Sequence, residues 1–157
     1  MTHVKVMRIL FLIPVIGFLF YITVFRSLNV GTDYLMYYNF YVRGDYIEIF
    51  DFFIVLIYDM ARNKGDFIFF TFSITGLFMI FNLWAIKKIS HNFFVSFTFF
   101  ILSFYYFYIY NGMRQAVAIS LIFMAVYYVQ KDRLKIKDLL LYTFFMILAI
   151  LFHVSAI

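Results

Sequence analysis

The stretch FIFFTFSITGLFMIFNLWAI, residues 67–86, decides the class of this protein because it contains no charged side chain over 20 residues. A second uncharged stretch of 22 residues runs from Asn92 to Met113. A helix rises about 1.5 Å per residue, so each stretch can cross a hydrocarbon core roughly 30 Å thick. The chain of 157 residues is 66% hydrophobic and 13% charged, too apolar to cover a soluble domain. The sequence therefore predicts an all-α integral membrane protein, a polytopic bundle of transmembrane helices.

Apolar segments predict about five spanning helices in a single transmembrane domain over residues 1–157. The longest apolar region, residues 93–130, would measure about 57 Å as one helix, nearly twice the thickness of the membrane core. It must therefore turn, and Asn111-Gly112 is the only turn signal within it. The expected spans are residues 9–25, 66–86, 93–110, 113–130 and 138–157, with an external loop at 26–65.

Basic side chains gather in alternate segments between the expected spans. These segments contain Lys5 and Arg8, then Lys87, Lys88 and His91, and finally Lys131, Arg133, Lys135 and Lys137. Cytoplasmic loops are rich in Lys and Arg, so we expect the N-terminus and all three segments in the cytoplasm. The external loop, Arg114 and the end of the last span then face outward.

Composition also argues against several kinds of site. The chain has no cysteine, so neither a disulfide nor a thiolate metal site can form. Its net charge of +5 is divided among segments that flank the spans, which argues against nucleic acid as a partner. The sequence contains no nucleotide-binding glycine loop and no metal-ligand spacing. We therefore expect no metal and no other cofactor.

The stretch NGMRQAVAIS, residues 111–120, places a permanent charge, Arg114, in the first turn of an expected helix. A cation at this positive end of the helix dipole is unfavourable by about 0.3–1 kcal/mol. Beside free backbone N–H groups, however, a guanidinium makes a good anion site, and pyrophosphate suits its bidentate geometry. The alternative is an interfacial arginine that extends toward water or lipid phosphate. The small residues Gly112, Ala116 and Ser120, spaced by four, predict close packing of this helix on a neighbour.

Two more ionisable residues are expected on the same side as Arg114. Arg26 follows the first span and is either an interfacial anchor or a ligand. His153 lies about 22 Å along the last helix from Asp138, near the expected level of Arg114. Histidine titrates near neutral pH, so His153 is a candidate general base, and the alternative is a structural hydrogen bond to a neighbouring helix.

The stretch NVGTDYLMYYNFY, residues 29–41, predicts a turn at Gly31 and a helix that opens near Asp33. Tyrosines at spacings of three and four line one face of this helix. That face suits either sugar stacking or the aromatic belt at the level of the lipid headgroups. Its members are Tyr34, Tyr37, Tyr38 and Tyr41. Residues 46–61 alternate apolar and acidic side chains, which predicts an outward-facing amphipathic helix.

Three stretches together resemble the EpsG family, the Wzy-type polymerases of bacterial exopolysaccharide, capsule and O-antigen. They are GTDYLMYYNFY at 31–41, NGMRQAVAIS at 111–120 and FHVSAI at 152–157. The resemblance implies a multi-pass membrane glycosyltransferase of the bacterial inner (plasma) membrane. Such enzymes join oligosaccharide repeats carried on undecaprenyl pyrophosphate, on the outer side. Family members are longer, with more spans after the last motif, so we expect a truncated chain that is inactive alone.

The resemblance also implies roles for the candidate residues. Arg114 would stabilise the pyrophosphate as leaving group without a metal, and Arg26 would hold a second phosphate. His153 or Asp33 would take the proton from the acceptor hydroxyl. Sugars would be positioned by Gln115, Tyr34, Tyr37 and Tyr41. The implied partners are the lipid bilayer, the lipid-linked oligosaccharide and other polysaccharide-export proteins.

Two alternative functions stay open from the sequence. An O-antigen ligase-type transferase would use the same lipid carrier but attach finished chains to a different acceptor. A non-enzymatic membrane subunit or transporter of polysaccharide export would need neither Arg114 nor His153 for chemistry. A transporter should also carry charged side chains along its helix interiors over the whole transport path. Here the polar residues gather on one face and the helix middles are apolar, which argues against a transporter.

Overall fold

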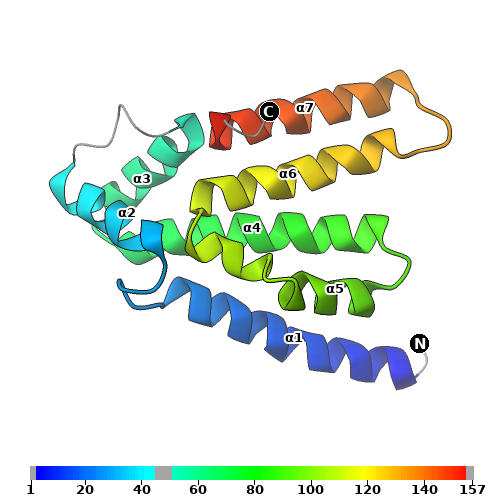
Figure 1. Cartoon of the computed structure of the whole chain (residues 1–157), viewed down its shortest axis with the longest axis horizontal. Helices are drawn as coiled ribbons and strands as arrows, with labels where there is room; N and C mark the ends of the chain where they lie inside the picture. The colour runs from blue at the N-terminus through cyan, green and yellow to red at the C-terminus, as the bar shows by residue number, and fades with distance from the viewer. Residues whose placement is uncertain (1–2, 45–50, 155–157) are drawn as a thin grey trace.

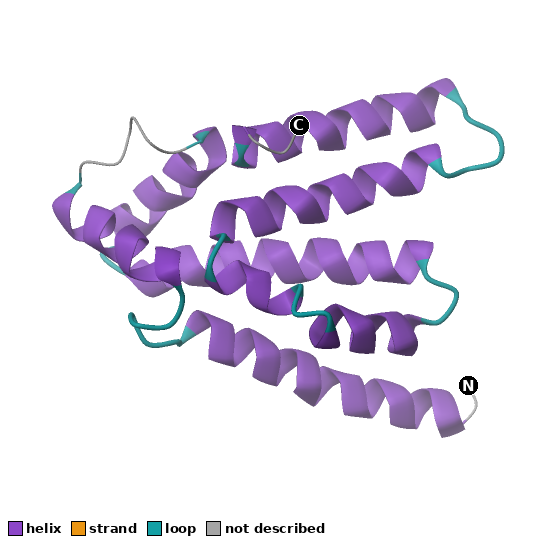
Figure 2. Cartoon of the chain, in the orientation of Figure 1, coloured by secondary structure: helices purple, strands orange, loops and turns teal. Residues whose placement is uncertain are grey.

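The computed structural model describes residues 3–44 and 51–154, and these ranges contain helices and loops but no strand (Figure 2). The predicted all-α class is therefore confirmed. The helices in chain order are α1 (His3–Val24), α2 (Thr32–Arg43), α3 (Phe52–Lys64), α4 (Phe67–Ile89), α5 (Phe93–Leu102), the 3₁₀ helix η1 (Tyr106–Tyr110), α6 (Met113–Val129) and α7 (Ile136–Phe152).

Five helices lie side by side along the long axis of the molecule: α1, α4, α5, α6 and α7 (Figure 1). The start of α1 and the loops α4–α5 and α6–α7 lie together at one end, which we call the basic end. The opposite end holds α2, α3, the start of α6 and the end of α7. The three basic segments thus lie at the same end of the bundle, as the alternating loops predict. The side of the membrane that this end faces stays a prediction.

Helix ends follow the local chemistry of the sequence. The Asp66 side chain accepts a hydrogen bond from the Ile68 N–H at 2.8 Å and so caps α4. Asn92 caps α5 in the same way, through Phe94 at 3.1 Å. At their C-terminal ends, α2 and α3 stop at Gly44 and Gly65, both with left-handed backbones (φ 83° and 67°). Gly44 ends α2 before the segment that leads to α3, and Gly65 ends α3 just before α4 begins.

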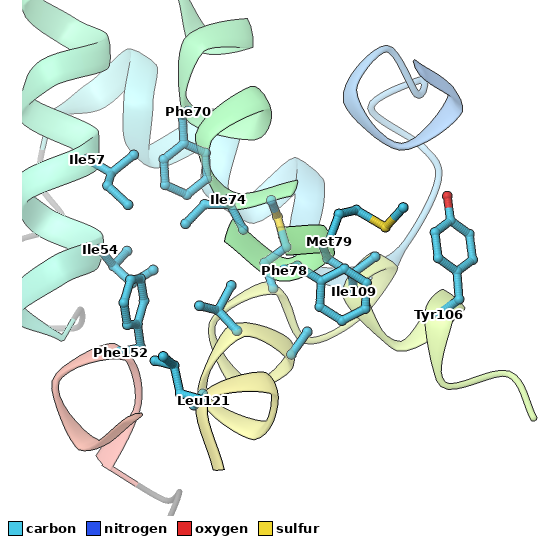
Figure 3. Close-up of a cluster of buried hydrophobic side chains, with 14 of the residues drawn as sticks. Ile54, Ile57, Phe70, Ile74, Phe78, Met79, Tyr106, Ile109, Leu121 and Phe152 are labelled. Atoms are coloured by element: carbon cyan, nitrogen blue, oxygen red, sulfur yellow. The ribbon is translucent and has the colours of Figure 1, made fainter. Parts of the chain in front are cut away.

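The core lies where α3, α4, α6 and α7 meet (Figure 3). Ile54 and Ile57 of α3, Phe78 of α4, Leu121 of α6 and Phe152 of α7 are buried there. These side chains fix α3 and the end of α7 against the bundle, so both elements reach the same corner of the molecule.

The small-residue face of α6 packs against α4 at Ser120, as the spacing predicts. Ala116 and Ser120 are fully buried, and the Asn82 amide of α4 donates to the Ser120 hydroxyl at 2.5 Å. Between helices in lipid the hydrophobic effect contributes little, so close packing and such hydrogen bonds hold the pair together.

One helix in the described ranges, α4, is both long and apolar enough to cross a membrane, at 23 residues. Three apolar helical segments are shorter: Leu10–Val24, Phe93–Leu102 and Met113–Val129. Large apolar side chains such as Phe11 and Phe18 are exposed on α1, as expected for a lipid-facing surface. The structure therefore supports α4 as a membrane-spanning helix, and the other four expected spans stay a prediction.

The expected continuous helix at 93–110 is wrong. Helix α5 ends at Leu102, Phe104 takes a left-handed backbone (φ 61°), and the chain continues as η1. The tyrosines of η1 supply the reason, because they bind α1 instead of extending a helix. The Tyr106 hydroxyl donates to the Leu19 carbonyl at 2.6 Å and lies 2.5 Å from the Thr23 hydroxyl.

The external loop contains the two predicted short helices. Gly31 precedes α2, and the Thr32 N–H donates to the Asn111 side chain at 3.1 Å, which ties the start of α2 to the turn before α6. Of the expected amphipathic helix at 46–61, residues 46–50 lie outside the described residues. The rest forms α3, which buries one face and exposes Phe52 and Asp59 on the other.

Candidate functional site

Three helix termini meet at the end of the bundle opposite the basic end. They are the N-terminus of α3, the N-terminus of α6 and the C-terminus of α7. Each terminus contributes one ionisable side chain: Asp51, Arg114 and His153. We refer to these three residues as the polar triad.

Asp51 is the centre of the triad. Its Oδ2 accepts a hydrogen bond from Arg114 Nη1 at 3.0 Å and lies 3.2 Å from His153 Nδ1. Its Oδ1 accepts from the Val154 N–H at 3.2 Å. The carboxylate is 10% exposed, so these contacts replace most of its hydration. One carboxylate therefore joins segments of α3, α6 and α7.

The Asp51 side chain does not cap its own helix. It stands at the N-cap of α3, where an aspartate normally accepts from its own helix, yet it makes no side-chain cap hydrogen bond. Sequence reasoning missed Asp51 as a site residue. The sequence places it inside the expected amphipathic helix at 46–61, as one of its acidic residues. Nothing local points to partners 63 and 102 residues away.

His153 lies outside α7. The helix was expected to continue to residue 157, but it ends at Phe152, and His153 is extended (φ −164°, ψ 119°). The extended backbone turns the imidazole toward Asp51 and Gln115 instead of along the helix surface. The prediction that His153 lies level with Arg114 is confirmed, because both contact the same carboxylate oxygen.

Gln115 extends the network away from Asp51. Its Nε2 lies 3.1 Å from His153 Nε2, and its Oε1 accepts a hydrogen bond from the Tyr108 hydroxyl. Because the glutamine N–H can only donate, His153 Nε2 must be an acceptor, and Nδ1 then carries the proton toward Asp51. A continuous chain of hydrogen bonds thus runs from Tyr108 through Gln115 and His153 to Asp51 and Arg114.

Arg114 occupies the first turn of α6, as predicted. Its side chain is 20% exposed, and the Asp51 carboxylate offsets the unfavourable placement of a cation at a helix N-terminus. Tyr37 of α2 lies beside it. Burial raises the pKa of the Tyr37 hydroxyl, and Arg114 opposes that shift, while Asp33 and Asp51 add to it. Tyr37 is therefore a neutral phenol among three charged groups, close to Arg114.

Asp33 is near the triad but not part of it. Its Oδ1 accepts from the Thr32 hydroxyl at 3.3 Å, and the side chain is half-buried. It interacts electrostatically with Tyr37, as Arg114 does.

Arg26 forms a second cationic position. Its guanidinium lies over the rings of Tyr34 (4.1 Å) and Tyr110 (4.9 Å) and donates to the Thr23 carbonyl at 3.3 Å. The residue is 8% exposed, and its Nε has no hydrogen-bond partner among the described residues. Burial lowers the pKa of Arg26, and the tyrosine oxygens oppose that shift. The unpartnered Nε–H is itself buried in this structure.

The tyrosine face of α2 is turned into the protein. Tyr34 and Tyr37 are buried, and Tyr34 and Tyr41 contact the Phe67 ring of α4, with centroids 5.5 and 5.3 Å apart. These contacts secure α2 on the bundle. The sugar-binding role of Tyr34, Tyr37 and Tyr41 stays a prediction.

Metal-ligating side chains do not cluster in the described part of the chain: no three His, Asp, Glu or Cys residues come together there. The expectation that the site works without a metal stays a prediction.

The family comparison agrees with the resemblance in the three motifs. No curated protein and no solved structure shows significant similarity to the chain. The model of the EpsG family, however, matches residues 9–157. This match includes Arg26 and every member of the polar triad and covers almost the whole sequence. The chain therefore belongs to the EpsG family.

Proposed function

We propose that this protein polymerises oligosaccharide repeats linked to undecaprenyl pyrophosphate, by glycosyl transfer at the outer face of the bacterial inner membrane. The products would be exopolysaccharide, capsule or O-antigen. The observation that carries the proposal is the polar triad, which joins Arg114 and His153 through one carboxylate at the end remote from the basic loops. Membership of the EpsG family indicates, at the level of the family, a membrane protein of polysaccharide polymerisation.

The reaction needs two kinds of group. The acceptor hydroxyl oxygen attacks the anomeric carbon of the donor, and the bond from that carbon to the pyrophosphate oxygen breaks. The bonding electrons leave with the pyrophosphate, and the hydroxyl proton passes to a base. A cationic site must therefore stabilise the leaving group, and a base must stand beside the acceptor.

His153 is the better placed base of the two candidates. With Nδ1 donating to Asp51, Nε2 carries the lone pair that would take the proton once it is released from the Gln115 amide. The Asp51 carboxylate fixes the ring and stabilises the imidazolium that forms, in the manner of an Asp-His pair. Gln115 holds Nε2 in this structure, and we place the acceptor hydroxyl where the Gln115 amide now lies. Asp33 lacks such a partner, since its described hydrogen bond comes from Thr32.

Arg114 would bind the pyrophosphate together with the N–H groups at the start of α6. Its Nη1 is engaged by Asp51, so a phosphate would share the guanidinium fork or compete with the carboxylate. Arg26 would hold a second phosphate only after its buried, unpartnered Nε became accessible. We propose that the basic end faces the cytoplasm, which puts this site on the outer side.

The test uses the host with this gene deleted and complemented. Wild type should restore a long polysaccharide ladder on a gel, whereas Arg114→Ala should leave single repeats while the protein stays in the membrane. Arg43→Ala, at the exposed C-terminal end of α2, is the matched control and should restore the ladder. A full ladder with Arg114→Ala would overturn the proposal. Long polymer that stays on its lipid carrier in the deletion strain would instead indicate a ligase.

A further inference from the structure

A hollow of about 480 Å³ lies at the basic end, far from the polar triad. It opens between the C-terminal parts of α4 and α6 and the start of α7. Its walls are aromatic and its rim is basic. The proposed polymerisation needs neither the aromatic wall nor the basic rim of this hollow.

The aromatic wall is built from side chains that support one another. Trp84 meets the Tyr127 ring edge-on, with centroids 5.4 Å apart, and lies nearly parallel to Tyr128 at 6.1 Å. Tyr128 in turn stacks on Phe145 at 5.7 Å. All are half-buried, so the wall is both firm and accessible.

The rim carries more positive charge than the protein neutralises. Lys131 pairs with Asp138, whose second oxygen accepts from the Lys135 N–H at 3.1 Å. Both oxygens of this carboxylate are thus engaged. Within the ranges that the structure describes, no ion pair neutralises Lys88, Arg133 or the Lys135 ammonium, and all three are exposed. The hollow therefore attracts anions.

Membrane orientation alone does not require this arrangement. Basic residues set topology by their number and place in the loops, without a concave site. Here the cations surround a hollow with a tryptophan wall at the end of a membrane helix. Phosphate matches the rim, and a glyceryl chain matches the wall, as expected for a lipid headgroup bound between helices at the cytoplasmic surface.

We propose that this hollow binds the phosphodiester headgroup of an anionic phospholipid. Arg133 and Lys135 hold the phosphate, Lys88 closes the rim, and Trp84 contacts the glycerol backbone. The proposal is independent of the polymerase reaction and of the polar triad.

Trp84 makes the test direct, because it is the single tryptophan of the chain. Purified full chain in detergent is titrated with short-chain phosphatidylglycerol, phosphatidylcholine or inorganic phosphate while tryptophan fluorescence is recorded. Phosphatidylglycerol should give a saturable change, which phosphatidylcholine does not. Arg133→Gln combined with Lys135→Gln should weaken the apparent affinity about tenfold or more. The matched control, Arg43→Gln combined with Lys64→Gln at the opposite end, should bind like wild type.

Each other outcome would overturn the proposal. Equal responses to both lipids would mean that the acyl chains, not the phosphate charge, are recognised. Saturation by inorganic phosphate with no further response to phosphatidylglycerol would assign the site to a soluble phosphate. Unchanged affinity in the Arg133 and Lys135 double variant would remove the rim from the site. Circular dichroism of that variant shows whether its helices are intact.

Discussion

His153 Nδ1 lies 3.2 Å from the same Asp51 oxygen that accepts from Arg114 at 3.0 Å, although 102 residues separate His153 from Asp51. A shared oxygen makes the proposed base, His153, and the proposed anion-binding cation, Arg114, interdependent. Moving the carboxylate changes the orientation of the imidazole and the charge at the start of α6 together.

Asp51→Asn should therefore abolish polymer formation, with a loss of about 100-fold or more in transfer rate. The amide keeps the shape of the side chain but neither neutralises Arg114 nor stabilises an imidazolium. The measurement is polysaccharide length in the complemented deletion strain, alongside protein abundance in the membrane. Asp132→Asn, in the exposed loop at the basic end, is the control. Normal polymer from Asp51→Asn would show that the carboxylate is only structural.

His153→Gln should lower the rate of glycosyl transfer much more than Gln115→Ala. Loss of a general base costs about 10²–10⁴-fold in rate, whereas Gln115 only holds the Nε2 side of the ring. Single-turnover transfer with purified lipid-linked repeat separates the chemical step from substrate binding. Gln115→Ala should retain a measurable step, and a loss equal to that of His153→Gln would place Gln115 in direct contact with the reacting groups.

Gly31→Ala should destabilise the attachment of α2. Gly31 has φ 90°, and an added Cβ would collide with the Tyr110 carbonyl. Left-handed strain alone costs about 1–3 kcal/mol, and the collision adds to it. Gly65→Ala is the matched control, since its φ is 67° but the space around it is open. The midpoint temperature of thermal unfolding in detergent should be clearly lower for Gly31→Ala than for Gly65→Ala. Equal midpoints would refute the close approach of Gly31 to η1.

The Asn82–Ser120 hydrogen bond should contribute about 0.6 kcal/mol, and at most about 1.7 kcal/mol, to the pairing of α4 with α6. A double-mutant cycle with Asn82→Ala and Ser120→Ala measures the coupling free energy of unfolding. Ser73→Ala provides the comparison, because within the described ranges the Ser73 hydroxyl donates only to the Phe69 carbonyl of its own helix, at 2.7 Å. A coupling energy near zero would mean that the small residues of α6 stabilise the α4–α6 pair through close packing and not through this hydrogen bond.

The helices could be read from the sequence where charge and capping mark them. The uncharged run of α4 and the Asn111-Gly112 turn before α6 both predict the observed elements. The break after Leu102 could not be predicted from the sequence, because Phe104 takes a left-handed backbone where no glycine marks a turn. The hydroxyl contacts between η1 and α1 accompany this break, and they depend on tertiary packing. Arg114 and His153 stood out as charges in apolar surroundings. Asp51 did not, because the sequence places it among the acidic residues of the expected amphipathic helix at 46–61. Its partners are brought to it only by the packing of α3 and α7.

The wide sequence separation within the polar triad also sets an order of events during synthesis. Asp51 leaves the ribosome 102 residues before His153. At about 5–20 residues per second this interval is roughly 5–20 s, during which the carboxylate has no imidazole to orient. Arg114 emerges in between and can pair first. If the proposed roles hold, the nascent chain acquires its anion-binding half before its proton-accepting half, and the docking of α7 is the step that completes the site.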